Sequence, residues 1–237
     1  MDQVSAVSKE TNFTSLPENQ PTPNARMRFG FRFVQFIART MLKIFFGLKV
    51  EGRENVPRSG AFIYASNHKS FIDPPIVGST TPREIHFAAK KELFSIPLLG
   101  SLIAYLNAVP VKRKGFEREA LVKLGGALEI GGAFVIFPEG TRFLDDKLHP
   151  PKAGVGLMAL KYDVPIIPVF ISNSASPRRQ LIQRKLKVTY GKPFRIADLG
   201  ELPPGKEAYY TAAQRIMERI AETGGVEPPE IVRETQE

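Results

Sequence analysis

The chain has 237 residues, 43% of them hydrophobic, which suits one domain with a core of its own. It contains no cysteine, so disulfides, thiolate metal sites and a cysteine nucleophile are excluded. Its formal net charge of +9 favours anionic partners such as an anionic membrane, phosphorylated substrates or nucleic acid.

Both ends of the chain are predicted to be disordered. Residues 1–25 are polar and carry three prolines, and no apolar core of a signal peptide follows the first residues. Residues 224–237 contain two prolines and four glutamates and are expected to form a flexible tail.

Residues 26–49, RMRFGFRFVQFIARTMLKIFFGLK, are predicted to form an amphipathic helix with six basic residues and no acidic one. At about 100° per residue, one narrow stripe of this helix holds Arg28, Arg32, Gln35, Arg39 and Lys43. Phenylalanine and aliphatic side chains occupy the wide remainder, a pattern typical of a segment that lies in a membrane interface. Charges interrupt the apolar runs well short of the ~18 residues of a membrane span. The alternative is a helix packed on the core with a solvated basic edge.

Short apolar runs alternate with helical patterns between residues 50 and 223. Strands are expected at residues 61–65, 85–89, 108–111, 133–137, 165–171 and 186–190. Helices are expected after Asp73 and at residues 97–106, 117–130, 153–162 and 206–222. This alternation predicts a single α/β domain with a mixed, largely parallel sheet flanked by helices, preceded by the amphipathic membrane-interface helix.

An uncharged stretch at residues 93–111 approaches the length that crosses a bilayer. Pro97, Gly100 and Pro110 interrupt it, which favours a helix followed by a strand. We expect a buried or membrane-facing hydrophobic unit, with a re-entrant or spanning segment as the alternative.

Residues 66–75, SNHKSFIDPP, follow a predicted strand and contain one of the three histidines. Ligands bind at strand exits in α/β sheets. His68 could therefore act as a general base if a carboxylate orients its ring. Asp73 could do so only across a turn, because positions five apart diverge by about 140° on a helix. Asp73 could also be an N-cap with Pro74 as the first helical residue, and the two roles are compatible.

Two further strand exits carry basic residues. Residues 137–142, FPEGTR, contain Gly140, which permits a sharp turn that would bring Arg142 to the sheet edge that holds His68. Arginine binds phosphate through paired, charge-assisted hydrogen bonds, although a surface arginine after a turn is the alternative. The basic trio at residues 112–114 follows another strand, and a solvated loop is its usual explanation.

Taken together, these segments resemble the glycerophospholipid acyltransferase family typified by 1-acylglycerol-3-phosphate (lysophosphatidic acid) acyltransferase. The matching blocks, in the family's order, are N-H-x-S-x-x-D at Asn67, His68, Ser70 and Asp73; K-x-E-L-F-x-x-P-x-x-G from Lys90 to Gly100, running to Arg113; FPEGTR at residues 137–142; and VPIIPV at residues 164–169. Asn107 departs from the pattern, because the family often has glycine there.

The resemblance implies an enzyme that transfers a fatty acyl group from acyl-CoA or acyl-acyl carrier protein to the sn-2 hydroxyl of 1-acylglycerol-3-phosphate, forming phosphatidic acid. It implies His68 as the general base and Asp73 as the group that orients it, with no covalent acyl-enzyme and no cofactor. The implied substrate-binding residues are Arg113 and Arg142 for the phosphate, Lys112 as a helper, and Glu139, Gly140 and Thr141 around the acceptor. No metal is expected, because His86 and His149 show no ligand spacing with each other or with His68.

The expected partners are a lysophospholipid acceptor, the thioester donor and an anionic membrane surface. The resemblance implies a monotopic or peripheral protein on the cytosol-facing leaflet, where thioester donors occur. One alternative is an acyltransferase for glycerol-3-phosphate, another lysophospholipid or a lyso-aminolipid. Another is a non-catalytic membrane-binding module. Nucleic acid is not expected as a partner, because no recognised nucleic-acid module is present.

Overall fold

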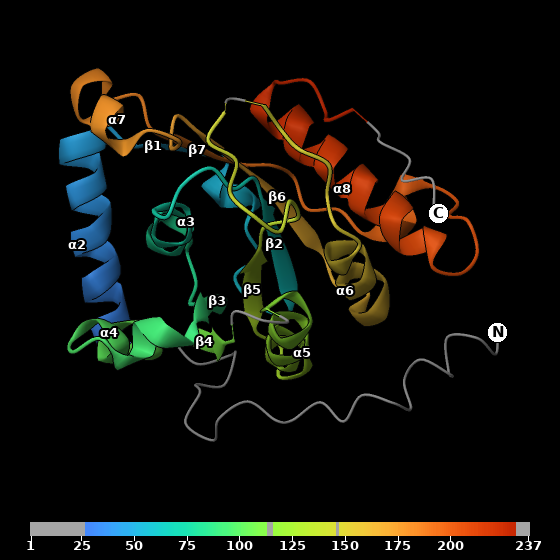
Figure 1. The fold of residues 1–237 in the computed structure, drawn as a ribbon, viewed down its shortest axis with the longest axis horizontal. Coiled ribbons are helices and arrows are strands. Elements are labelled where there is room, and N and C mark those ends of the chain that lie inside the picture. The colour runs from blue at the N-terminus through green and yellow to red at the C-terminus, as the bar shows by residue number, and fades with distance from the viewer. Residues whose placement is uncertain (1–26, 113–115, 146, 231–237) are drawn as a thin grey trace.

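The centre of the computed structural model, which describes residues 27–112, 116–145 and 147–230, is a five-stranded sheet (Figure 1). In spatial order its strands are β1 (Lys49–Glu51), β7 (Lys187–Tyr190), β6 (Ile166–Ser172), β2 (Phe62–Ser66) and β5 (Ala133–Ile136). Only the β6–β7 pair is antiparallel within this sheet. The predicted α/β fold with a mixed, largely parallel sheet is confirmed.

A second, parallel pair of strands extends the sheet beyond β5. It consists of β3 (Phe87–Lys90) and β4 (Ala108–Val111). A parallel bridge joins it to β5, where His86 N donates to Ala133 O at 2.8 Å and Val135 N donates to His86 O at 3.0 Å. The carboxyl ends of β2, β5, β3 and β4 therefore meet at one edge.

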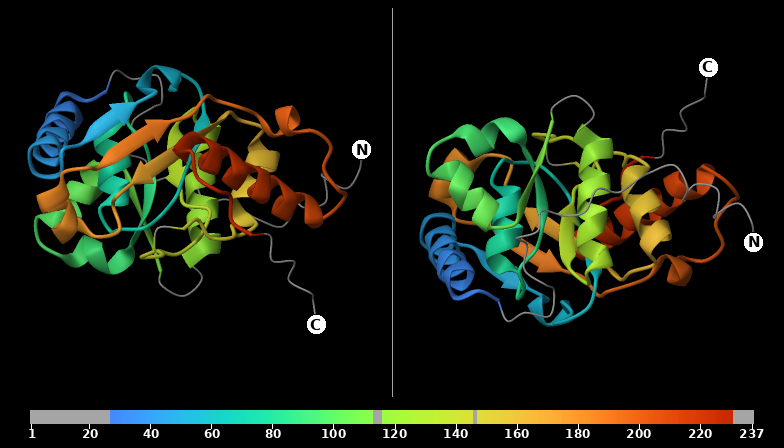
Figure 2. Two further views of the ribbon diagram at one scale, coloured as in Figure 1. Left: turned by 90° about the horizontal axis from the view of Figure 1, so that it is seen from above. Right: turned by 90° about the horizontal axis from the view of Figure 1, so that it is seen from below.

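Helices cover both faces of the sheet (Figures 1 and 2). They are α2 (Phe29–Phe46), α3 (Asp73–Thr80), α4 (Leu99–Tyr105), α5 (Phe116–Glu129), α6 (Gly154–Tyr162), α7 (Pro177–Gln183) and α8 (Glu207–Gly224), with short 3₁₀ helices η1 (Arg53–Asn55), η2 (Lys91–Ser95) and η3 (Ile196–Leu199). Phe62 and Tyr64 on β2 pack toward α3, whereas Ile63 and Ala65 pack toward α5, α6 and α8. Alternate side chains of a strand point to opposite faces, so β2 is buried on both.

The predicted strands and helices between residues 61 and 222 are present, with ends within two residues of the expected ones. Strand β1 and helix α7 were not predicted. The expectations for residues 1–25 and 231–237 lie outside the described residues. Helix α8 ends at Gly224, and Gly225 caps it in the left-handed conformation.

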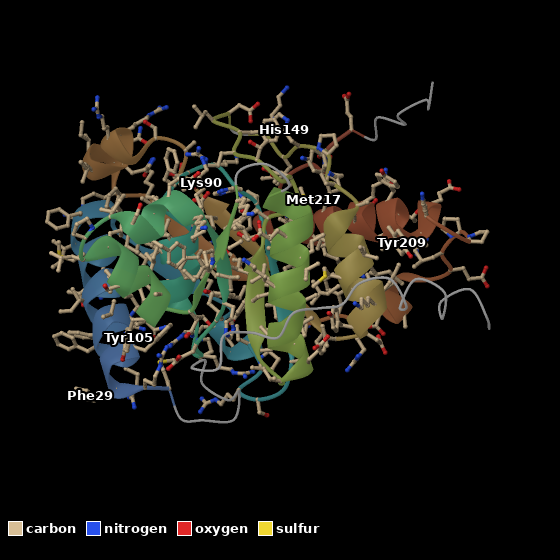
Figure 3. The ribbon with its side chains drawn as sticks, turned by 60° about the horizontal axis from the view of Figure 1, so that its bottom comes forward. Phe29, Lys90, Tyr105, His149, Tyr209 and Met217 are labelled. Carbon is tan, nitrogen blue, oxygen red and sulfur yellow. The ribbon has the colours of Figure 1, made fainter. Side chains whose placement is uncertain are left out.

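Helix α2 lies along one edge of the molecule and packs on α3. Gln35 Nε2 donates to Gly78 O at 2.9 Å and to Thr81 O at 2.8 Å, and Arg28 pairs with Glu84 at 2.8 Å. Two members of the predicted stripe thus contact the body of the protein, whereas Arg32, Arg39 and Lys43 are exposed, so the stripe is only partly solvated. The outer face is apolar, and Figure 3 shows Phe29 at its margin. The exposed apolar residues are Phe29, Phe33, Phe36, Ile37, Met41, Ile44 and Phe45.

The uncharged stretch at residues 93–111 folds into the end of η2, then α4 and β4. No helix in the described ranges is both long and apolar enough to cross a membrane. Asn107 precedes β4 with a φ of 65°, a left-handed conformation that asparagine tolerates better than most residues. Its side chain accepts from Arg28 at 2.8 Å and donates to Glu84 at 3.1 Å. Asparagine therefore adopts the left-handed conformation that glycine would adopt at this position. It also adds a hydrogen bond to Arg28 at the start of α2.

Candidate active site

A turn between β2 and α3 brings His68 and Asp73 together. His68 Nδ1 lies 2.9 Å from Asp73 Oδ2, so the predicted contact is confirmed. The same oxygen accepts backbone N–H bonds from Lys69 at 2.7 Å and Ser70 at 2.6 Å. An ionised carboxylate can only accept, so Nδ1 carries the proton and Nε2 is the acceptor. Asp73 is fully buried, while the His68 side chain is 17% exposed and can meet a substrate.

Asp73 is not the N-cap of α3, and that expectation is wrong. It is the first helical residue, Ile72 precedes it as the cap, and its carboxylate bonds to residues before the helix rather than within it. An N-cap needs the N–H groups of the first turn. Pro74 and Pro75 have none, and Ile76 N donates to Ile72 O at 2.9 Å, so the carboxylate finds its donors in the turn that holds His68.

Two neighbouring segments hold His68 in place. Asn67 is fully buried and forms two hydrogen bonds to β6. Its Nδ2 donates to Ile171 O at 3.0 Å, and its Oδ1 accepts from Ile171 N at 2.7 Å. The His68 ring stacks on Phe137 with centroids 4.0 Å apart. Phe143 N donates to His68 O at 3.1 Å. The imidazole position is therefore set by the FPEGTR segment as well as by its own turn.

The FPEGTR segment turns sharply at Gly140, which has a φ of 69°. Beyond the turn, the Arg142 guanidinium lies 3.2 Å from the centre of the Phe71 ring. Arg142, Gly140 and Thr141 line the same cavity as His68. The structure thus brings these expected site residues to one place.

Glu139 differs from its neighbours because its side chain does not line that cavity. It is 2% exposed, and neither carboxylate oxygen has a hydrogen bond of ordinary geometry. Burial raises the pKa of Glu139 to about 8, although the backbone N–H groups of His68 and His149 favour the ionised form. The expected direct contact with the acceptor is not supported by this placement.

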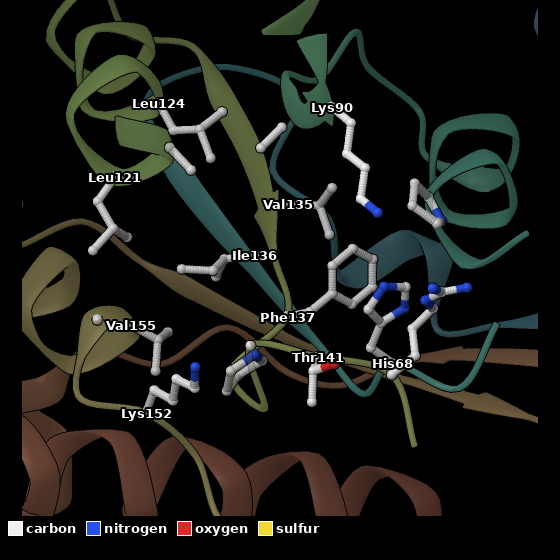
Figure 4. Close-up of a pocket in the computed structure, with 17 residues that line it drawn as sticks. His68, Lys90, Leu121, Leu124, Val135, Ile136, Phe137, Thr141, Lys152 and Val155 are labelled. Atoms are coloured by element: carbon white, nitrogen blue, oxygen red, sulfur yellow. The ribbon is translucent and has the colours of Figure 1, made fainter. Parts of the chain in front are cut away.

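The cavity has a volume of about 380 Å³ and two chemically distinct sides (Figure 4). The cationic side carries His68, Lys90 and Arg142, whereas Lys152 lies next to Val155 on the other side of the cavity. The apolar side carries Ala120, Leu121, Leu124, Val135, Ile136 and Val155. Sequence reasoning missed Lys90 and Lys152 as site residues. Lys90 opens the second family block and could have been found from it, whereas Lys152 carries no comparable signal.

Of the basic trio at residues 112–114, which follows β4, the structure describes only Lys112. Lys112 is exposed, its backbone N donates to Glu119 Oε2 at 2.8 Å, and it is not part of the cavity lining. Arg113 lies outside the described residues. Both follow a strand whose carboxyl end reaches the same edge as His68.

The other two histidines, His86 and His149, make contacts that indicate structural roles. Burial lowers the pKa of His86, whose Nδ1 lies 3.2 Å from Ala133 O. His149 stacks on Phe143 and contacts the Asp145 carboxylate at 2.9 Å. Over the described part of the chain, no three metal-ligating side chains gather.

The fold and the cavity define an acyltransferase: residues 47–172 match the sequence profile of the Acyltransferase family, and the chain belongs to that family. It is 30% identical over 193 residues to the 1-acyl-sn-glycerol-3-phosphate acyltransferase of Bacillus subtilis (strain 168), covering 81% of this chain and 96% of that protein. It is 32% identical to the chloroplastic 1-acyl-sn-glycerol-3-phosphate acyltransferase BAT2 of Brassica napus, covering 60% of this chain and 43% of the plant protein.

A solved structure also resembles this fold. It is the crystal structure of the 1-acyl-sn-glycerophosphate (LPA) acyltransferase, PlsC, from Thermotoga maritima, with a TM-score of 0.61 and 28% sequence identity. The similarity covers 81% of this chain and 78% of that one. The family resemblance drawn from the four sequence blocks is confirmed.

Proposed function

We propose that this protein transfers a fatty acyl group from acyl-CoA or acyl-acyl carrier protein to the sn-2 hydroxyl of 1-acylglycerol-3-phosphate, forming phosphatidic acid for phospholipid synthesis. The observation that carries the proposal is the His68–Asp73 pair at a cavity with one cationic and one apolar side. Such a cavity matches an acceptor that joins a phosphate to an acyl chain. The names of the relatives support the same reaction.

The chemistry begins with proton transfer to His68. Nε2 takes the proton of the acceptor hydroxyl while the hydroxyl oxygen attacks the thioester carbonyl carbon. The buried Asp73 carboxylate stabilises the imidazolium that forms. The tetrahedral intermediate then collapses, the carbon–sulfur bond breaks, and the imidazolium proton passes to the departing thiolate. The products are the ester and a free thiol, and no acyl group is attached to the protein.

The cationic side of the cavity binds the phosphate of the acceptor. Arg142 supplies a planar donor group, and Lys90 adds a positive charge on the same wall. We assign Arg113 and Lys112 to the same task as residues that follow β4. Gly140 and Thr141 shape the wall beside Arg142. Glu139 is buried beside them and does not line the cavity.

The apolar side of the cavity suits an acyl chain. Leu121 and Leu124 on α5 face Ile136 on β5 across it. Burying each methylene of a chain gains about 0.8 kcal/mol. An aliphatic chain in this recess would place its polar end next to His68.

The apolar outer face of α2 supports a position on the membrane. An enzyme in the interface takes its acceptor from the leaflet without exposing the acyl chain to water. We assign membrane contact to residues 26–49, acyl transfer to residues 50–223, and the location to the cytosol-facing leaflet as a monotopic or peripheral protein.

One assay tests the proposed reaction against its alternatives. Purified protein is incubated in vesicles with acyl-CoA or acyl-acyl carrier protein and a panel of acceptors, and products are identified by mass spectrometry. The panel holds 1-acylglycerol-3-phosphate, glycerol-3-phosphate, a lysophospholipid with a larger head group and a lyso-aminolipid. We expect phosphatidic acid as the dominant product. A different dominant product would reassign the acceptor, and no product with any acceptor would favour a membrane-binding module.

A further inference from the structure

Helix α7 exposes its aliphatic side chains and buries an amide. Ile182 is 86% exposed and Leu181 49%, whereas Gln180 is only 4% exposed. Gln180 Oε1 accepts from Lys185 N at 3.2 Å, and its Nε2 donates to Gln183 Oε1 at 3.3 Å. The helix is thus held by a polar interior contact while its apolar groups point outward. Single exposed apolar residues are common on protein surfaces, so this pair is informative only where it adjoins a larger apolar surface.

Helix α7 is joined closely to the end of α2. Leu186 N donates to Phe46 O at 3.1 Å, and Lys49 N donates to Leu186 O at 2.9 Å. A Cβ placed on Gly47 would lie 2.2 Å from Arg184 O, so the two segments approach as closely as glycine allows. The apolar pair of α7 therefore keeps a fixed position relative to the apolar face of α2.

The opposite end of α2 carries a similar feature. Leu98, just before α4, is 88% exposed and has a φ of 62°, an unfavourable conformation for a leucine. Arg28 ties this end to α2 through a 2.7 Å bond to Tyr105 O. Figure 1 shows α7 and α4 at the two ends of α2, and Figure 2 shows both of them to the same side of it. The exposed apolar residues of these three helices therefore lie along one edge of the molecule.

The charges around α7 indicate what covers it. No acidic residue occurs between Asp163 and Asp198 in the sequence. Four exposed basic residues flank the aliphatic pair, namely Arg178, Arg179, Arg184 and Lys185. The aliphatic side chains complement the acyl chains of a phospholipid leaflet, and the surrounding basic side chains complement its anionic head groups.

We propose that α7 is a second bilayer contact, with Ile182 and Leu181 inserted at the acyl boundary and Leu98 inserted at the far end of α2. A single interfacial helix can roll about its own axis. Contacts to one side of it prevent rolling and give the cavity one orientation toward the leaflet. This inference rests on the proposed placement of α2 in the interface but concerns residues that the placement does not require.

The absence of tryptophan from the chain allows a direct test. Ile182→Trp would introduce the only indole, on a side chain that already points away from the body. With vesicles of phosphatidylglycerol and phosphatidylcholine, its emission should shift to the blue and be quenched by lipids brominated on their acyl chains. The matched control is Ile130→Trp, because Ile130 is 41% exposed and follows the end of α5, which is not one of these three helices. Its emission should stay unchanged.

Partitioning gives a second readout. Ile182→Ser should lower the vesicle partition coefficient about tenfold, as expected for loss of one inserted aliphatic side chain. Ile130→Ser should leave it unchanged, and circular dichroism checks that both variants fold. If wild-type protein co-sediments with vesicles while the Ile182→Trp emission remains that of water, the α7 contact is overturned and the α2 placement stands.

Two other outcomes also decide against the inference. Wild-type protein that does not co-sediment with anionic vesicles overturns the α2 placement, and this inference with it. A blue shift of the Ile182→Trp emission that grows with protein concentration in the absence of lipid overturns the inference too, because it identifies a second copy of the chain as the partner.

Discussion

At the scale of single residues, the contact of Asp73 Oδ2 with His68 Nδ1 sets which ring nitrogen carries the proton. Asp73→Asn keeps the size of the side chain but offers His68 Nδ1 an amide that can donate. The imidazole would then carry its proton on Nε2 and could not take one from the acceptor. We expect kcat to fall by about 10²–10⁴ with little change in stability. Steady-state kinetics checks this, and a kcat within about threefold of wild type would contradict the orienting role.

Glu139 predicts a pH-dependent stability. Its folded pKa of about 8 lies above the ordinary 4.5, so the native state binds more protons between these values. The free energy of unfolding therefore falls as pH rises from about 5 to 8, by up to ~1.4 kcal/mol per pH unit. Glu139→Gln mimics the neutral acid and should flatten this slope in urea titrations at pH 5, 6.5 and 8. Glu218→Gln, at an exposed position, should keep the wild-type slope, and an unchanged slope in Glu139→Gln would refute a neutral buried carboxyl.

The His68–Asp73 contact could be predicted because both residues lie in one short turn next to a strand. That Lys90 and Lys152 line the same cavity could not be predicted, because this depends on how β3 and the segment before α6 pack around β5. The inward turn of Glu139 depends on the left-handed backbone at Gly140 and on burial by neighbouring loops. Those distances are set by tertiary packing and leave no local pattern.

At the scale of elements, strand β1 and helix α7 escaped prediction for different reasons. Strand β1 has only three residues and owes its place to pairing with β7, far along the chain. Helix α7 has no inward apolar stripe, because its aliphatic side chains point outward. Strands β2 and β6 were predicted because burial on both faces gives them continuous apolar runs.

The joint between α2 and α7 is expected to be sensitive to a single methyl group. Gly47→Ala adds a Cβ at a φ of 64°, 2.2 Å from Arg184 O, and should lower the free energy of unfolding by more than ~2 kcal/mol. Gly60→Ala is the control, because Gly60 has a φ of 81° and open space around its Cβ position. It should cost only about 1 kcal/mol for the backbone conformation. Chemical denaturation measures both, and equal losses would show that the contact contributes nothing.

At the scale of the whole molecule, α2 is part of the fold and also supplies the outer apolar face. Phe31 is 3% exposed against the body, while Phe33 and Phe36 are 58% and 57% exposed. Deleting the helix would uncover α3, so surface substitutions are the sharper test of membrane contact.

The pair of substitutions Phe33→Ser and Phe36→Ser should reduce vesicle binding by more than tenfold without unfolding the protein. Turnover of an acceptor embedded in vesicles should fall accordingly. Turnover of a short-chain acceptor dispersed in water should stay near wild type, because the cavity is untouched. Co-sedimentation and parallel assays with the two acceptors separate these effects. Equal losses with both acceptors would indicate damage to the fold rather than to membrane contact.

The central claim is that His68 performs base catalysis of acyl transfer to 1-acylglycerol-3-phosphate. Its most direct test is the rate of phosphatidic acid formation by wild-type protein and His68→Ala under identical vesicle conditions, with thiol release followed in parallel. Wild-type protein should release one thiol per phosphatidic acid formed. His68→Ala, with the same circular dichroism and vesicle binding, should be slower by about 10²–10⁴-fold. Phosphatidic acid formation by His68→Ala at a rate near that of wild type would contradict the account.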